Sequence, residues 1–157
     1  MTFSIYTIGY GNRSISEFIQ ILKKHQIQAV IDVRTTPFSR YRPAFNQKRL
    51  IEHLSEAGIG YKHKGTELGG LPKDPLLLTD GFPDYEKIRK TIPYQNGLNY
   101  LECGIEIEFR IVIMCACLDY RKCHRHNLIG LDLIRRGYDV IHISKDGKTE
   151  VQTTLNF

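Results

Sequence analysis

The sequence has no hydrophobic run that approaches the roughly 18 residues needed to cross a bilayer. It also lacks a positively charged N-terminal region followed by an apolar stretch, so its start does not resemble a secretory signal peptide. The four cysteines all lie between residues 103 and 123, which is not the distributed pattern of a disulfide-stabilised secreted domain. These absences predict a cytoplasmic protein that keeps its thiols reduced and has no membrane segment.

The chain also lacks internal repeats and any linker that would divide it. Its 157 residues suffice for one domain, residues 1–157, with a single sizeable core. Hydrophobic residues make up 41% and charged residues 25%, which is ordinary for a folded domain. The net charge of +5 permits anionic partners, but it is too small to establish nucleic-acid binding.

Short apolar runs alternate along the chain with segments of helical periodicity. Strand patterns cover residues 5–8, 27–33, 59–64, 111–114 and 139–143, and helical patterns cover residues 15–25, 46–57, 94–106 and 119–136. This alternation predicts an α/β fold with a mainly parallel sheet and helices on both faces. We interpret residues 71–93 as an irregular excursion over the site that can act as a lid, and the residues after 148 as a polar tail.

The central stretch of the sequence is residues 111–136, in which a strand pattern leads through two cysteines into a basic helix start. The cationic side chains of these first turns are Arg121, Lys122, His124, Arg125 and His126. Each cation costs roughly 0.3–1 kcal/mol there, because the N-terminal end of the helix macrodipole is positive. Free backbone N–H groups and arginine forks form a natural site for phosphate, sulfate or carboxylate. The alternative is that these long side chains extend into water.

A second basic region follows the strand pattern at residues 27–33. Asp32 and Arg34 arrive together at the carboxyl end of this strand, which is where open α/β sheets bind ligands. In the next loop, Arg40 and Arg42 alternate with aromatic residues, a composition that suits phosphate contact combined with base stacking. The alternative is that the aromatic rings pack into the core and the arginines pair with nearby carboxylates.

Two glycine-rich segments also follow strand patterns. The first, Gly9-Tyr10-Gly11, allows a close approach of backbone to phosphate, but it stops short of a full dinucleotide-binding motif and is more typical of a tight turn. The second, residues 65–70, is expected to be a loop at the end of the strand pattern that contains Tyr61.

Several ordered motifs support a family resemblance. They are Thr7-Ile8-Gly9, Asp32-Val33-Arg34 with Pro37, Ser39-Arg40 and Phe45, Tyr61 with Leu68-Gly69-Gly70, and Cys115-Ala116 followed by Cys123-His124-Arg125. In these motifs the chain resembles the bacterial and archaeal proteins grouped as domain of unknown function 488. The resemblance covers most of the chain, implies a compact α/β fold and leaves the function open.

The chain departs from the pattern of that family at three positions. Tyr10 and Gly11 stand where a histidine and a serine are usual, and Cys117 stands where a glutamate is usual. A carboxylate that could serve as a shared general acid or base is therefore missing next to the predicted site.

These observations favour a domain that binds or acts on a phosphate-bearing ligand, either a nucleotide or nucleic acid. The candidate anion-binding residues are Gly9, Arg34, Arg40, Arg42, Tyr61, Gly69 and Arg125. The candidate catalytic residues are Asp32, Cys115, Cys123 and His124. Asp32 would orient an arginine or act as a base, and His124 would transfer a proton. No pattern indicates an oligomeric state.

Three other hypotheses stay open for the same residues. Cys115 and Arg121 have the C-x5-R spacing of cysteine phosphatases, although the intervening loop has no glycine. The cysteines and histidines near residue 120 do not match common zinc spacings, so we predict no metal and no other cofactor, and we interpret Cys115 as a small buried hydrophobe. The third hypothesis is an interaction module without catalysis.

Overall fold

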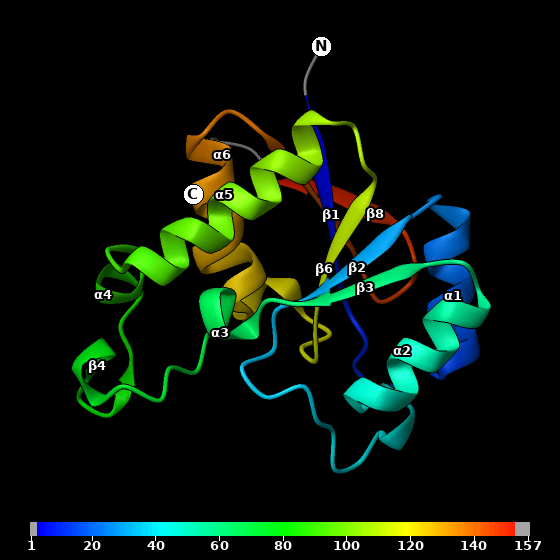
Figure 1. Cartoon of the computed structure of the whole chain (residues 1–157), viewed down its shortest axis with the longest axis horizontal. Coiled ribbons are helices and arrows are strands. Elements are labelled where there is room, and N and C mark those ends of the chain that lie inside the picture. The colour runs from blue at the N-terminus through cyan, green and yellow to red at the C-terminus, as the bar shows by residue number, and fades with distance from the viewer. Residues whose placement is uncertain (1–2, 153–157) are drawn as a thin grey trace.

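A twisted sheet runs through the computed structural model, which describes residues 3–152 (Figure 1). Its strands follow the order β3-β2-β6-β1-β7-β8. Their bounds are β1 Ser4–Gly9, β2 Ala29–Asp32, β3 Gly60–His63, β6 Ile111–Cys115, β7 Asp139–Ile143 and β8 Thr149–Gln152. Neighbouring strands from β3 to β7 pair in parallel, and β8 pairs antiparallel with β7. The predicted mainly parallel sheet is confirmed.

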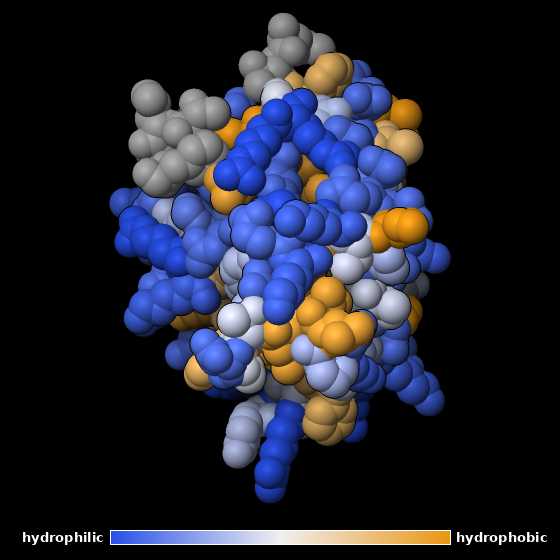
Figure 2. Space-filling view, turned by 90° about the vertical axis from the view of Figure 1, so that its left-hand side faces the viewer, coloured by the Kyte–Doolittle hydropathy of each residue, from blue (hydrophilic) through white to orange (hydrophobic). Residues whose placement is uncertain are grey.

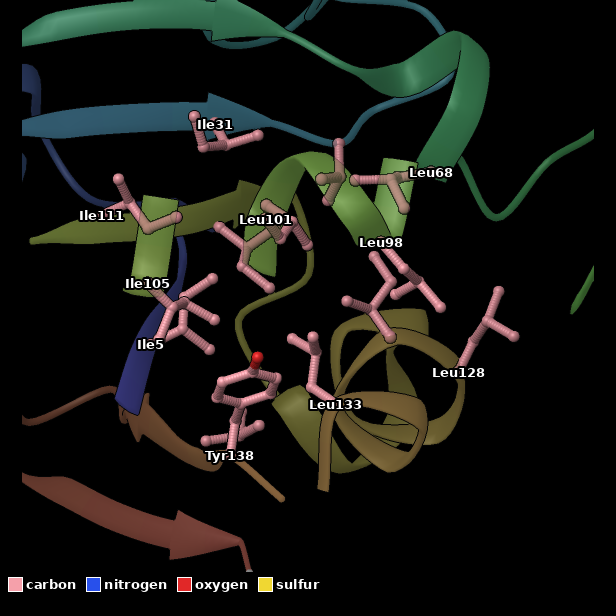
Figure 3. Packing of buried hydrophobic residues seen from close by; sticks show 14 of the residues in the cluster. Ile5, Ile31, Leu68, Leu98, Leu101, Ile105, Ile111, Leu128, Leu133 and Tyr138 are labelled. Atoms are coloured by element: carbon pink, nitrogen blue, oxygen red, sulfur yellow. The ribbon is translucent and has the colours of Figure 1, made fainter. Parts of the chain in front are cut away.

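The two faces of the sheet carry separate hydrophobic clusters. On one face, α1 (Ile15–Lys24) and α2 (Gln47–Glu56) bury residues such as Phe18 and Leu50 against the sheet. On the other face, α5 (Ile92–Glu106), η4 (Arg125–Gly130) and α6 (Leu131–Arg135) cover a second cluster, part of which Figure 3 shows. Burying each large apolar side chain stabilises the fold by about 1.5–3 kcal/mol. The structure is therefore an α/β domain with helices on both faces (Figure 1).

The predicted helix at residues 119–136 is not continuous. Asp119 caps only a 3-10 turn, η3 (Tyr120–Lys122), because its side chain accepts a hydrogen bond from the backbone N–H of Arg121. Cys123 is then extended, with φ −118° and ψ 148°, and η4 continues as a wide π-type turn before α6 begins. A π-type turn of this kind is frequently found at functional sites. The break separates residues 115–123, which we call the cysteine loop, from the helix that follows.

Three other sequence interpretations need correction. The segment after β3 forms a helical turn, α3 (Gly65–Leu68), instead of a loop. Of the predicted polar tail, Thr149–Gln152 form β8, and residues 153–157 lie outside the described residues. The excursion at 71–93 is not irregular throughout. It contains η2 (Pro75–Leu77), the strand pair β4 (Leu78–Thr79) and β5 (Phe82–Pro83), and α4 (Tyr85–Arg89). The β4–β5 turn consists of Asp80 and Gly81 with φ values of 53° and 82°, the conformation that tight hairpins need.

This excursion forms the left-hand side of the molecule in Figure 1 and carries exposed apolar residues, among them Leu71, Leu76 and Phe82. Figure 2 shows that the face on this side is mostly hydrophilic, with apolar residues gathered in its lower half. Among residues 3–152, no helix combines the length and the apolar character that crossing a membrane requires.

Candidate functional site

The loops that follow β1, β2 and β6 meet at the carboxyl edge of the sheet. The chain leaves β1 toward α1 on one face and leaves β6 toward η4 on the other, although these two strands are neighbours. Such a reversal opens a crevice between the loops, and open α/β sheets bind ligands there. The crevice has a volume of about 620 Å³. It is lined by Tyr10, Arg34, Thr35, Thr36, Phe38, Gly70, Leu71, Lys73, Tyr85, Cys115, Ala116, Cys117, Lys122, Cys123 and His124. We call it the cleft.

One side of the cleft is fixed by a buried ion pair after β2. Arg34 donates from Nε and Nη2 to the two carboxylate oxygens of Asp32, at 2.9 and 2.7 Å. Tyr61 on β3 donates its hydroxyl to the same carboxylate at 2.7 Å. Burial and the hydrogen bond to Asp32 raise the pKa of Tyr61. Burial lowers the pKa of Arg34, but the hydrogen bonds and the charge of Asp32 raise it by more. The guanidinium is thus permanently charged and oriented.

Tyr10 links this ion pair to the core. Its ring stacks on Phe45 with centroids 4.3 Å apart, and its hydroxyl accepts a hydrogen bond of 3.4 Å from Nη1 of Arg34. The guanidinium also lies 5.4 Å from the centre of the Tyr10 ring. Asp32, Arg34 and Tyr61, which the sequence analysis proposed as site residues, therefore form one network, and Tyr10 extends it.

Arg125 lies behind the floor of the cleft and is fully buried. Its Nε donates to the sulfur atoms of Cys115 and Cys123 at 3.0 and 3.4 Å, and its Nη2 donates to the carbonyl oxygen of Cys117 at 2.6 Å. Among the described residues, no carboxylate forms an ion pair with it. Burial lowers the pKa of Arg125, but the electrostatic and hydrogen-bonding interactions with the Cys115–Cys123 pair raise it by more. Its donors point at the cysteine loop and not into the open cleft.

Three sulfur atoms gather in front of Arg125. Cys115 Sγ and Cys123 Sγ are 2.9 Å apart, and the Sγ atoms of Cys115, Cys117 and Cys123 all lie within 4.8 Å of one another. Hydrogen bonds with Cys117 and Cys123, together with burial, raise the pKa of Cys115 well above its usual value. Hydrogen bonds with Cys115 and Cys117 lower the pKa of Cys123 below its usual range. These contacts favour ionisation of Cys123 over ionisation of Cys115.

His124 lies beside Cys123. Its Nε2 is 3.3 Å from the carbonyl oxygen of Val33, and its Nδ1 is 3.6 Å from Cys123 Sγ. A carbonyl oxygen only accepts, so Nε2 carries a proton and Nδ1 faces the sulfur. Nδ1 then accepts from a Cys123 thiol or, when protonated, donates to its thiolate. This geometry suits the proton transfer expected of His124.

A chain of buried polar groups supports Arg125 from behind. Nη1 of Arg125 donates to Thr7 Oγ1 at 3.0 Å, and that hydroxyl therefore donates to Nδ1 of His142 at 2.6 Å. Nε2 of His142 donates to Oε1 of Gln152 at 2.7 Å. Burial lowers the pKa of His142 from 6.5 to about 4, so the ring is neutral at neutral pH. Neither Thr7 nor His142 was proposed from the sequence.

Two glycines among the candidate residues serve close packing in this structure. A Cβ atom on Gly9 would overlap the carbonyl oxygen of Cys117 and lie 2.9 Å from Nη2 of Arg125. A Cβ atom on Gly69 would overlap the backbone of Gly65 and the hydroxyl of Thr35. Gly9 therefore lets the end of β1 approach the cysteine loop, and Gly69 does the same for α3 and the loop after β2.

Other proposed residues lie apart from the cleft. Arg40 and Arg42 are exposed in the loop after β2, where Arg40 lies 5.8 Å from the ring of Tyr41. Arg121 is also exposed and pairs with Glu150 on β8 at 3.2 Å, so it does not face Cys115 as an arginine of a phosphatase loop would.

Residues of the cleft wall that were not proposed as site residues from the sequence include Lys73, Tyr85 and Lys122. Lys122 belongs to the basic segment that was recognised, but no pattern in the sequence distinguishes Lys73 or Tyr85.

Together, the doubly wound sheet and the thiol-rich cleft at its carboxyl edge define an α/β domain with a crevice at a topological switch point. The family model described as Domain of unknown function DUF488 matches residues 14–131, which is more than half of the chain. The protein therefore belongs to this family. The match includes the Asp32–Arg34 pair and the cysteine loop with His124 and Arg125. No curated protein and no solved structure matches the chain.

Proposed function

We propose that the protein binds a phosphate-bearing ligand, of the size of a nucleotide or the end of a nucleic-acid strand, in the cleft. The observation that carries this proposal is the charge of the cleft wall. Arg34, Lys73, Lys122 and His124 line it, and none of its described lining residues is acidic. The volume of about 620 Å³ falls within the range of small-molecule sites, about 300–1,000 Å³.

The positive charges of the cleft are not equivalent. Asp32 already balances Arg34, so this arginine contributes oriented N–H donors more than net charge. Lys73 and Lys122 are exposed, and none of the ion pairs among the described residues includes them. These lysines supply the uncompensated charge. Of the four arginines proposed from the sequence as anion-binding residues, only Arg34 lines the cleft. Lys73 and Lys122 join it there, and Arg125 lies behind the floor.

Apolar and aromatic surface completes the cleft. Phe38 and Leu71 are 61% and 71% exposed, and Tyr85 lines the same wall. Exposed aromatic rings beside cationic groups suit a ligand with a flat ring next to its phosphate, since a base–aromatic stack contributes about 1–3 kcal/mol. Nucleotides meet this description and are abundant in the cytoplasm, the location we propose from the sequence.

The test measures binding of a labelled nucleoside monophosphate and of a short single-stranded oligonucleotide across a salt series. The double variant Lys73→Ala/Lys122→Ala is compared with Lys48→Ala/Arg49→Ala, a matched pair of exposed cations on α2. For the oligonucleotide, we expect the slope of log affinity against log salt to fall by about 2 in the cleft variant, because about one slope unit belongs to each phosphate contact.

The two ligands distinguish the two sources of phosphate. Tight binding of the nucleotide alone identifies a small-molecule site, whereas binding that needs the oligonucleotide identifies a nucleic-acid site. Equal losses of affinity in the cleft variant and the α2 variant would overturn the proposal, since the binding would then reflect the overall charge of the protein and not a specific site.

A further inference from the structure

The sulfur cluster has chemistry that ligand binding does not use. Cys115 and Cys123 are 3% and 2% exposed, yet both contribute to the floor of the cleft. Their sulfur atoms are 2.9 Å apart. A disulfide bond is about 2.05 Å long, so a movement of less than about 1 Å would join them.

The buried guanidinium requires a negative charge in this cluster. Burying an unpaired cation costs several kcal/mol, and Arg125 has no carboxylate partner among the described residues. The groups that accept from it are a hydroxyl, a carbonyl oxygen and two sulfur atoms. Only a sulfur atom can be anionic, so the Cys115–Cys123 pair holds one proton and one negative charge.

The surroundings assign the charge to Cys123. When Cys115 is the donor of the short contact between the two sulfur atoms, Cys123 accepts hydrogen bonds from Cys115, from Arg125 and, when the imidazole is protonated, from His124. Cys115 stands at the carboxyl end of the buried strand β6, has no histidine beside it, and keeps its proton. A thiolate with a neighbouring thiol at contact distance is the arrangement that thiol–disulfide exchange needs.

We propose that Cys123 and Cys115 form a dithiol that reduces the disulfide of an acidic small molecule bound in the cleft. Only the preference for an acidic substrate rests on the proposed function. The Cys123 thiolate attacks one sulfur of the substrate R–S–S–R, forms a mixed disulfide and releases one thiolate, RS⁻. Cys115 then attacks the sulfur of Cys123, and its proton passes to the second departing group, which leaves as RSH. The protein ends with a Cys115–Cys123 disulfide and has given up two electrons. Two molecules of a small thiol reductant reverse the exchange.

A metal ion fits the cluster less well. Thiolate ligands of a tetrahedral zinc ion, with Zn–S bonds of about 2.3 Å, lie about 3.7 Å from one another. The sulfur atoms of Cys115 and Cys123 are 2.9 Å apart, and the guanidinium of Arg125 is directed at both. The pair would have to open before it could hold such an ion, whereas disulfide formation needs it only to close.

The reaction is measured with dithiobis(nitrobenzoate), an anionic aromatic disulfide, in a Cys103→Ser/Cys117→Ser background, because both of these cysteines are exposed. Peptide mapping is repeated on the Cys103→Ser protein, in which Cys117 is present and can compete for disulfide formation. The background protein is expected to release two equivalents of thionitrobenzoate in a fast phase and to contain a Cys115–Cys123 disulfide by peptide mapping. Cys115→Ser is expected to release one equivalent from Cys123 and to stop at the mixed disulfide. In Cys123→Ser, the fast phase is expected to slow by about tenfold or more.

Circular dichroism establishes that each variant is folded, and Cys123→Ala replaces Cys123→Ser if the serine variant is not. A fast phase that survives both substitutions of Cys123, or a disulfide that contains Cys117 in place of Cys115, would overturn the proposal.

A second reagent separates this proposal from the proposed function. Neutral dithiodipyridine has no charge for the lysines to attract. Lys73→Ala/Lys122→Ala is expected to slow the reaction with the anionic reagent about fivefold more than the reaction with the neutral reagent, which corresponds to about 1 kcal/mol of electrostatic attraction. An unchanged anionic rate together with an intact Cys115–Cys123 disulfide would reject the acidic substrate and the proposed function, but not the dithiol.

Discussion

Two buried arginines flank the cleft, and they differ in the group that balances their charge. Arg34 is 6% exposed and binds the carboxylate of Asp32, whereas Arg125 is 0% exposed and binds the sulfur atoms of two cysteines. A carboxylate hydrogen-bonded to a guanidinium is held in its charged form by that partner. A thiolate loses its charge when it is protonated, alkylated or oxidised. The charge balance of Arg34 is therefore permanent, and we call this the permanent side of the cleft. The charge balance of Arg125 varies with the chemical state of the thiols, and we call this the changeable side.

The permanent side gives the largest expected effect. Asp32→Ala should lower the free energy of unfolding by about 3–5 kcal/mol, because it leaves the guanidinium of Arg34 buried without a partner. Urea denaturation measures this loss, with Glu52→Ala on the exposed face of α2 as the control. The double variant Asp32→Leu/Arg34→Met should recover part of the loss, since it removes both charges. A loss below about 1 kcal/mol would show that the ion pair does not organise this side.

His142 supports Arg125 through Thr7, and its burial should make the free energy of unfolding depend on pH. The folded-state pKa of His142 is lowered from 6.5 to about 4, so protonation favours the unfolded chain. The contribution of this neutral ring is complete above the unfolded pKa. It should decline by about 3 kcal/mol as the pH falls from about 6.5 to about 4. Urea denaturation of the native protein and of His142→Gln isolates this term, because the glutamine does not titrate. Parallel pH profiles for the two proteins would contradict the buried neutral histidine.

The contact between β1 and the cysteine loop gives a smaller effect. Gly9→Ala should destabilise the fold by about 1–3 kcal/mol, because its methyl group overlaps the carbonyl of Cys117 and forces the loop away from Arg125. Gly60→Ala is the matched control in β3, since a Cβ atom there meets nothing closer than 3.5 Å. Thermal melting compares the two variants. If both variants have the melting temperature of the native protein, the close approach at Gly9 does not hold the cysteine loop in place.

The smallest effect belongs to the exposed arginine that the phosphatase hypothesis requires. Arg121→Ala removes an ion pair with Glu150 in which both side chains are at least half exposed, so it should cost less than about 1 kcal/mol. The rate at which Cys123 reacts with a disulfide should stay within about twofold of the native rate, as a surface charge of this kind is well screened. A much larger loss of thiol reactivity would return Arg121 to the site and favour the C-x5-R hypothesis.

Local sequence patterns are sufficient to predict the permanent side of the cleft, the Asp32–Arg34 pair. Asp32 and Arg34 are two residues apart at the end of an apolar strand, so an extended backbone already places both on one side. The alternation of strands and helices was sufficient to predict the parallel sheet with two covered faces, which the structure confirms.

The changeable side depends on contacts that local patterns do not specify. The short distance between Cys115 and Cys123 results from a 3-10 turn, an extended residue and a π-type turn in succession, where the periodicity predicts a plain helix. The contact between Thr7 and His142 joins residues 135 positions apart, and it exists because β1 and β7 are neighbours in that register. The charge of Cys123 is likewise a consequence of packing, since it depends on the burial of Arg125 away from every carboxylate of the described chain.

The most direct test of the central claim, that a thiolate at Cys123 balances Arg125, is the rate of Cys123 alkylation by iodoacetamide as a function of pH. Peptide-resolved mass spectrometry follows Cys123, and N-acetylcysteine in the same tube is the reference for a free thiol with a pKa of about 8.5. The account predicts that the Cys123 rate changes by less than about twofold between about pH 6 and pH 8, while the reference slows by about tenfold per pH unit on the acid side. A Cys123 rate that falls in parallel with the reference would contradict it, because the sulfur would then be a neutral thiol and Arg125 would have no counter-charge.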